Sequence, residues 1–231
     1  VTRVGTHKGE SPAVVVVLAA GSLPATGYLK NVIELDDHGL IKINDHLQTS
    51  DPDIYAVGDA TLVPFAPTGQ DNRIALATVA RRQGRIAAQN LLGGDLPMQP
   101  VSGSSALSVF DYHFASTGVK EGTSAKLGVT SASVLVTDTV RPAFVPADAG
   151  NAKVWFKLTY DPTDGRVLGA QIMSKVDVTA NINAIAVAIQ AHMTVADLAY
   201  ADFFFQPGFD RPWNIINVAA QQAVTQLPSA K

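Results

Sequence analysis

The stretch Leu47–Ala60, LQTSDPDIYAVGDA, decides how the first half of this chain is interpreted. Its Ser50–Asp53 segment favours a turn, because Pro52 fixes its own φ and disfavours helix at the preceding residue. The apolar residues Ile54–Val57 come next, and their short β-favouring run predicts one buried strand. The stretch therefore predicts a turn, a strand and a sharp exit.

The exit from this strand carries Gly58 and Asp59. Glycine has no Cβ, so the backbone at Gly58 can turn tightly or approach a ligand closely. Asp59 follows where a parallel strand would end, which is the usual place for ligand contacts in open α/β sheets. Two interpretations stay open from the residues alone: a buried strand with a capping aspartate, or a carboxylate that contacts a ligand.

The segment TSDPDIYAVGDA resembles the second FAD-contacting motif of the pyridine nucleotide-disulphide oxidoreductase family, T-x-x-x-x-[IV]-Y/F-A-x-G-D. The resemblance implies that Asp59 hydrogen-bonds the ribityl chain of a flavin, with Gly58 beside it. It extends through Ile74–Asn90 and nearly all of Gly103–Gln222. Within the family, the chain is most similar to the branch of NADH peroxidases and NADH oxidases.

Composition excludes several classes of protein. The chain has 231 residues, 47% hydrophobic and 16% charged, with a net charge of −3, so no basic excess indicates nucleic acid or an anionic membrane. The longest apolar run, Ala13–Ala20, is too short to span a bilayer. There is no cysteine, hence no disulfide and no thiolate. We predict no metal site and a cytoplasmic location.

Two features that the family requires are missing from the sequence. It contains neither a G-x-G-x-x-G phosphate loop nor a redox cysteine. In the family, both the FAD and NADH loops and the cysteine lie N-terminal to the motifs found here. We therefore expect this chain to be the C-terminal half of such an enzyme, to need an N-terminal FAD- and NAD-binding half as partner, and not to turn over alone.

The expected fold class is α/β plus α+β: the C-terminal piece of an FAD/NAD(P)-binding, Rossmann-like region followed by a mixed dimerisation domain. Residues 1–28 are expected to end the NADH-binding domain, residues 29–100 to form the C-terminal part of the FAD-binding domain, and residues 101–231 to form the dimerisation domain. The Gly-, Pro- and Ser-rich run from Gly93 to Ser105 marks the second boundary.

The first twenty residues predict two strands around a Gly-Glu-Ser-Pro turn. The run Ala13–Leu18 is continuous and β-branched, which is typical of a strand buried on both faces of a parallel sheet. By resemblance to the family, Gly21 would lie near the nicotinamide cofactor. An ordinary strand-to-turn glycine is the alternative.

A helix is predicted from about Ile74 to Leu92. Small residues recur along one stripe and would let the helix approach a sheet or a flavin closely: Ala77, Ala80, Gly84, Ala87 and Leu91. The start of a helix leaves backbone N–H groups free and carries partial positive charge. By resemblance, Leu76, Ala77 and Thr78 would contact the flavin there, and Ala75 would face the nicotinamide.

The rest of the chain predicts further strands and helices. Strands are expected at 32–35, 40–43, 106–110, 133–137, 154–160 and 167–173, with hairpin turns at 36–39 and 161–165. Helices are expected near 177–192, 194–201 and 215–226. Thr194–Asp197 resembles a capping box at the start of the second of these helices.

The most distinctive C-terminal stretch is Phe203–Asn214, FFFQPGFDRPWN, with five aromatics and two prolines. An exposed apolar loop of this kind is expected to be covered, and a two-fold dimer would use the same patch on both subunits. By resemblance, the loop reaches the partner's active site, with Phe205 and Pro207 as wall residues. Core packing within one subunit is the alternative.

The loop FFFQPGFDRPWN looks more like that of NADH peroxidases than of oxidases. The resemblance implies hydride transfer from NADH to FAD, and then reduction of hydrogen peroxide through a cysteine sulfenic acid in the other half. A water-forming NADH oxidase, with oxygen as substrate, is the runner-up, and a CoA-disulphide reductase comes third. A non-enzymatic dimerisation module is the alternative from a different class.

Overall fold

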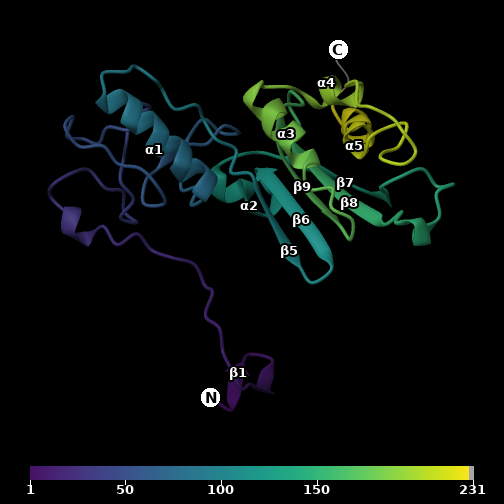
Figure 1. Ribbon diagram of the computed structural model, residues 1–231, viewed down its shortest axis with the longest axis horizontal. Helices are drawn as coiled ribbons and strands as arrows, with labels where there is room; N and C mark the ends of the chain where they lie inside the picture. Colours follow the sequence, from purple (N-terminus) through teal and green to yellow (C-terminus); the bar gives the residue numbers. More distant parts are fainter. Residues whose placement is uncertain (229–231) are drawn as a thin grey trace.

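The computed structural model describes residues 1–228 of the chain. Figure 1 shows three parts in chain order: an extended N-terminal arm, a unit of loops around helix α1, and a unit in which a β-sheet carries several helices. No helix within residues 1–228 has both the length and the apolar character needed to cross a bilayer.

The arm begins with an antiparallel hairpin of β1 (Arg3–Thr6) and β2 (Gly9–Pro12). The predicted Gly-Glu-Ser-Pro turn is therefore wrong, because those residues are β2 itself. The predicted buried strand Ala13–Leu18 is also wrong: this run does not form a strand, and Val14 is 92% exposed. A strand needs a neighbouring backbone, and among the described residues only Ala13 of this run has one, through its N–H, which donates to the Thr2 carbonyl at 3.1 Å.

The unit around α1 is held by short pairings rather than a regular sheet. Its regular elements are η1 (Gly27–Leu29), β3 (Val63–Pro64), β4 (Asp71–Asn72) and α1 (Ala77–Leu91). The predicted strand 54–57 is reduced to one bridge between Tyr55 and Gln48. The predicted strands 32–35 and 40–43 are reduced to isolated bridges of Ile41, antiparallel with Leu35 and parallel with Thr61. The turn 36–39 is confirmed by hydrogen bonds from the N–H groups of residues 38 and 40 to Asp36.

Helix α1 is confirmed, but its buried face differs from the predicted stripe. The buried residues are Val79, Gln83, Ala87 and Asn90. Gly84 lies on the exposed side, with nothing within 4 Å of the position of a Cβ, and Leu91 is 63% exposed. The predicted close approach at Gly84 is therefore absent from the described part of the chain.

The C-terminal unit is built on a five-stranded antiparallel sheet in the order β5-β6-β9-β8-β7. Its strands are β5 (Ser105–Val109), β6 (Tyr112–Gly118), β7 (Ala132–Thr139), β8 (Lys153–Tyr160) and β9 (Val167–Ser174). Four of the five match the predicted strands. The second, YHFASTG, was not predicted, since small and polar residues interrupt its apolar pattern.

Helices cover one face of this sheet and form the main core with it. They are α3 (Asn181–Gln190), α4 (Val195–Ala199) and α5 (Ile215–Val224), while α2 (Glu121–Ser124), η2 (Ala125–Leu127) and η3 (Ala147–Ala149) lie in connections. The core joins α3 and α5 to alternate residues of the strands: Val134, Val136, Val154, Phe156, Leu158, Ala170 and Ile172. The predicted capping box at Thr194 is confirmed, with both of its hydrogen bonds to Asp197 present.

The two units share a buried junction. Phe65 packs with Val119 and Leu168 in one cluster, and it pairs with Val101 as a parallel bridge. The Gly118 N–H donates to the carbonyl of residue 102 at 2.7 Å. The predicted linker is therefore partly packed into the junction, because Val101 is only 5% exposed.

Candidate functional site

A tight turn presents the carboxylate of Asp59. Gly58 has φ +95°, and its carbonyl accepts from the Thr61 N–H at 3.0 Å and from the Thr61 hydroxyl at 2.8 Å. Asp59 is exposed, and its side chain enters no hydrogen bond or ion pair within residues 1–228. The carboxylate is thus free to accept hydrogen bonds from a ligand.

The turn is fastened to α1 by Gln83, which is 0% exposed. The Gly58 N–H donates to Gln83 Oε1 at 2.7 Å, and Gln83 Nε2 donates to Thr61 Oγ1 at 2.9 Å. Sequence reasoning missed this residue. The available signal was its place on the inward stripe of α1, four residues after Val79 and four before Ala87.

The start of α1 offers free donors. Leu76 is the N-cap residue, in extended conformation and without a side-chain cap. The first helical hydrogen bonds run from Val79 N and Ala80 N to the Leu76 carbonyl. The N–H groups of Ala77 and Thr78 have no acceptor among the described residues, and both residues are exposed. These groups and the helix dipole favour an anionic or electron-rich ligand atom.

The segment that carries Gly21 is tied to the entry of this helix. Gly21 is exposed, with φ +102°. Arg73 Nη1 donates to the Ser22 carbonyl at 2.7 Å, and Arg73 Nη2 contacts the Ser22 hydroxyl at 2.8 Å. The structure therefore connects the neighbour of Gly21 to a residue two positions before Ala75, which is itself exposed.

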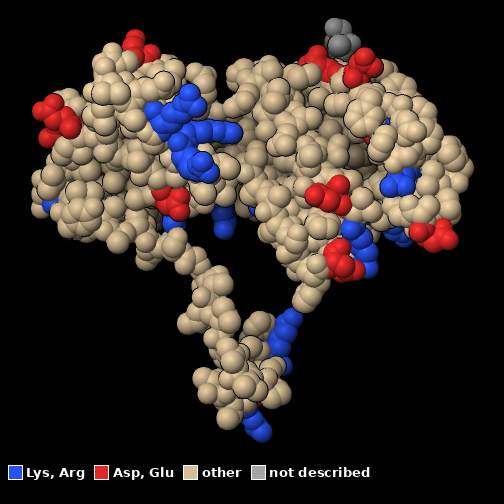
Figure 2. All heavy atoms as spheres, viewed as in Figure 1, with Lys and Arg blue, Asp and Glu red and all other residues tan. Residues whose placement is uncertain are grey.

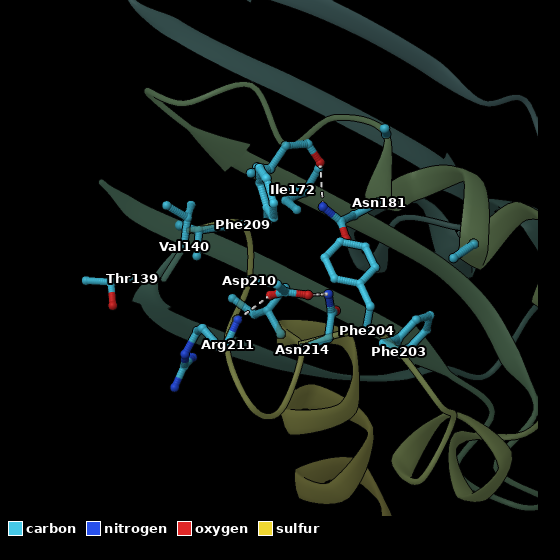
Figure 3. Close-up of a pocket in the computed structure, with 15 residues that line it drawn as sticks. Thr139, Val140, Ile172, Asn181, Phe203, Phe204, Phe209, Asp210, Arg211 and Asn214 are labelled. Carbon is cyan, nitrogen blue, oxygen red and sulfur yellow. Dashed lines mark hydrogen bonds between the residues drawn. The ribbon is translucent and has the colours of Figure 1, made fainter. Parts of the chain in front are cut away.

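The aromatic loop 203–214 lies in the C-terminal unit and closes one side of a hollow of about 350 Å³ (Figure 3). Phe203, Phe204 and Phe209 of the loop line it, together with residues of β7, β9 and α3. Asp210 stiffens the loop, because its carboxylate accepts from Asn214 Nδ2 at 2.7 Å and from the following backbone N–H at 2.7 Å.

The two wall residues expected from the family lie on the same loop but do not line this hollow. Phe205 is 48% exposed and Pro207 is half-buried. Figure 1 shows the loop before α5 and the helix α1 on opposite sides of the molecule. A single chain thus leaves Phe205 and Pro207 apart from the Asp59 turn, and their role as a partner's wall stays a prediction.

The charged side chains of the described residues form no metal-binding cluster. Figure 2 shows basic side chains gathered over α1, which carries Arg81, Arg82 and Arg85, while acidic side chains are scattered. Within residues 1–228, no three His, Cys, Asp or Glu side chains come together in a way that could hold a metal ion.

Family models match both parts of the chain. The model described as pyridine nucleotide-disulphide oxidoreductase matches residues 1–84, and the dimerisation domain of the same family matches residues 104–215.

Curated relatives and solved structures agree with these matches. The chain is 39% identical over 227 residues to an NADH oxidase of Enterococcus faecalis, covering 98% of this chain and 50% of the relative. It is 36% identical to an NADH oxidase of Streptococcus pyogenes, covering 95% of this chain and 48% of the relative. The chain thus spans about half the length of the curated relatives it matches.

Two solved structures extend the comparison. The water-forming NADH oxidase from Lactobacillus brevis bound to NADH has a TM-score of 0.90 and 36% identity, covering 97% of this chain and 49% of the other. The reduced Bacillus anthracis CoADR-RHD has a TM-score of 0.88 and 30% identity, covering 97% and 40%. The predicted fold class, a Rossmann-like piece followed by a dimerisation domain, is confirmed.

Proposed function

Because this chain belongs to the pyridine nucleotide-disulphide oxidoreductase family, in the branch that holds the NADH oxidases, we propose that it is the C-terminal half of an FAD-dependent enzyme that oxidises NADH. One observation carries this proposal: Gln83 of α1 fastens to that helix the turn that bears Asp59, whose carboxylate has no partner within residues 1–228.

These groups fit FAD by their chemistry. A fixed carboxylate without an internal partner can accept hydrogen bonds from the ribityl hydroxyls, which is the role we assign to Asp59, with Gly58 allowing close approach. Leu76, Ala77 and Thr78 would present the positive end of α1 to the pyrimidine edge of the flavin. FAD would supply the hydride and electron chemistry, and this chain's residues would bind it and favour its reduced, negatively charged form.

The nicotinamide side of the site would be formed by Gly21 and Ala75. Both are exposed, and the Arg73–Ser22 hydrogen bonds support their being neighbours. In this assignment residues 1–28 end the NADH-binding domain and residues 29–100 belong to the FAD-binding domain. The phosphate loops and the redox cysteine would come from an N-terminal half, and the cytoplasm stays the expected location.

We assign residues 101–231 to a dimerisation domain, and the aromatic loop to the homodimer interface. Four apolar aromatics of the loop are between 48% and 76% exposed: Phe204, Phe205, Phe209 and Trp213. Exposed aromatic surface of this kind costs free energy in water unless a partner covers it. In the dimer, Phe205 and Pro207 would line the active site of the other subunit.

The electron acceptor is proposed to be oxygen, because several curated relatives are NADH oxidases and one similar structure is described as water-forming. Hydrogen peroxide is the second candidate, favoured by the loop sequence FFFQPGFDRPWN. A CoA-disulphide reductase is the third, and the similar structure from Bacillus anthracis supports it. All three need a cysteine that this chain does not contain.

The test joins the first half of the Enterococcus faecalis NADH oxidase to this chain and measures flavin content, NADH oxidation and oxygen uptake. Two NADH consumed per oxygen, without released peroxide, would support the oxidase. Anaerobic NADH oxidation that depends on added peroxide would support the peroxidase, and dependence on CoA disulphide the reductase. A flavin-free, inactive dimer would favour a dimerisation module. The chain alone is expected to be inactive in every assay.

A further inference from the structure

We infer that Gln83 is the residue that fixes the Asp59 turn against α1, and so sets where the flavin-contacting carboxylate stands relative to the helix N-terminus. The inference rests on the proposed function, because it concerns the same site. Gln83 itself is 0% exposed and cannot touch a ligand. It is therefore a positioning residue.

Three hydrogen bonds form a closed ring around the turn. Gly58 N donates to Gln83 Oε1 at 2.7 Å, Gln83 Nε2 donates to Thr61 Oγ1 at 2.9 Å, and Thr61 Oγ1 donates to the Gly58 carbonyl at 2.8 Å. Both the amide oxygen and the amide nitrogen of one side chain are thus used on the two ends of a single turn. Asp59 lies between these ends.

Packing alone does not explain a glutamine at this position. Its neighbours on the inward stripe are Val79 and Ala87, so an apolar side chain would suit the face. A buried amide is unfavourable unless its donor and acceptor are both satisfied. The amide oxygen and nitrogen of Gln83 are both hydrogen-bonded only while the turn keeps this geometry. The buried amide therefore favours one position of the turn over others.

Because Gln83 lies on α1, its contact with the turn also sets the distance between the turn and the start of that helix. Thr78 and Gln83 are five residues apart on α1, which is about 7.5 Å along a helix axis. Within residues 1–228, Gln83 makes the only hydrogen bonds between α1 and the turn 58–61. On its other side the turn is held away from α1, by Ile41 N donating to the Ala60 carbonyl, and the segment before it is held by Ala56 N donating to the Leu47 carbonyl. Loss of Gln83 would therefore free the turn relative to the start of α1.

The same helix offers a matched control in Asn90, which is also a buried amide. Asn90 Nδ2 donates to the carbonyls of His46 and Leu96, and Asn90 Oδ1 accepts from Leu96 N. None of these hydrogen bonds of Asn90 involves the turn 58–61. Asn90→Leu should thus lower the stability of the unit as Gln83→Met does, without moving the Asp59 turn.

The first measurement is amide hydrogen exchange in the 231-residue chain. Global destabilisation by Gln83→Met raises the exchange rates of many amides. The exchange rate of the Gly58 N–H should increase about tenfold or more beyond that general increase. Asn90→Leu should show only the global rise. Thr61→Val removes the third member of the ring and should reproduce the Gln83 effect, which keeps the test open if Gln83→Met fails to fold.

The second measurement is FAD affinity of the chain joined to the first half of the Enterococcus faecalis NADH oxidase. Gln83→Met and Thr61→Val should each weaken FAD binding about tenfold, and Asn90→Leu should leave it unchanged. Equal effects of the Gln83 and Asn90 variants in either measurement would overturn the inference. If the unsubstituted protein binds no FAD, the proposed function fails, and the inference on the turn is then decided by hydrogen exchange alone.

Discussion

Arg73 holds Ser22 with two hydrogen bonds, although the residues are 51 positions apart: one guanidinium nitrogen donates to the Ser22 carbonyl at 2.7 Å, and a second contacts its hydroxyl at 2.8 Å. The arm is otherwise extended and mostly exposed up to this point. This pair is therefore where the arm becomes attached to the unit that carries α1.

Replacement of Arg73 should release the arm. In Arg73→Ala, limited proteolysis within residues 18–25 should become faster, because the two hydrogen bonds that hold Ser22 are lost. The melting temperature should fall by only a few degrees, since each of these exposed hydrogen bonds contributes about 1 kcal/mol. Arg81→Ala, on the exposed face of α1, is the control. An unchanged cleavage rate in Arg73→Ala would show that the arm is held by other contacts.

A substitution at Gly84 tests whether the exposed side of α1 is covered by another part of the protein. In the 231-residue chain, Gly84→Ala should raise the free energy of unfolding by about 1 kcal/mol, because alanine favours helix and nothing lies near the added Cβ. Gly118→Ala should instead lower it by about 1–3 kcal/mol. Its φ is +67°, and its Cβ would lie 2.1 Å from the Leu168 carbonyl oxygen. Chemical denaturation measures both, and destabilisation by Gly84→Ala would mean that this side of the helix is covered.

The His46 ring lies between two carboxylates and should make stability depend on pH. Its Nδ1 is 2.6 Å from Asp45 Oδ1, and its Nε2 is 2.8 Å from Asp95 Oδ1. The hydrogen bond to Asp45 is the main cause that raises the pKa of His46 above its usual 6.5, and Asp95 adds to it. The charged form is thus favoured in the folded state.

It follows that the contribution of His46 to stability is complete below pH 6.5 and is lost as the pH rises through the raised pKa. Denaturation at about pH 6 and about pH 8 should show a decrease that His46→Gln reduces. In an NMR titration, Asp45→Asn should lower the pKa of His46 more than Asp95→Asn does. The opposite order would contradict the assignment of Asp45 as the main partner.

The aromatic loop should control the oligomeric state. We expect the chain to be a dimer by light scattering, and Phe205→Ser combined with Phe209→Ser to be a monomer, because both rings are exposed on the loop. Tyr28→Ser, at an aromatic that is 80% exposed in the other unit, should stay a dimer. A monomeric unsubstituted chain would leave the loop without its proposed partner.

The sheet unit could be predicted well from the sequence because its signals are local. The turn 161–165 and the capping box at Thr194 are set by neighbouring residues, and both occur as predicted. Strand β6 was missed because its alternation is masked by small residues, and it is fixed by pairing with β5 and β9.

The prediction failed where an element depends on absent neighbours or on distant contacts. Ala13–Leu18 has the composition of a buried strand, but within residues 1–228 only Ala13 of this run makes a backbone hydrogen bond, to the Thr2 carbonyl. Gln83 could not be recognised as a site residue, since its role arises from a contact with Gly58, 25 residues earlier. The resemblance predicts which residues face a ligand, and only the structure shows the hydrogen bonds that hold the Asp59 turn in position.

The most direct test of the proposed flavin site is FAD binding by the chain joined to the first half of the Enterococcus faecalis NADH oxidase, compared with its Asp59→Ala variant. We predict one bound FAD per chain, seen by visible flavin absorbance. In Asp59→Ala the affinity for FAD should be weakened about tenfold or more, because a charged hydrogen-bond acceptor is lost. Equal FAD affinity of the two proteins would contradict the assignment of Asp59, and with it the flavin site proposed for this chain.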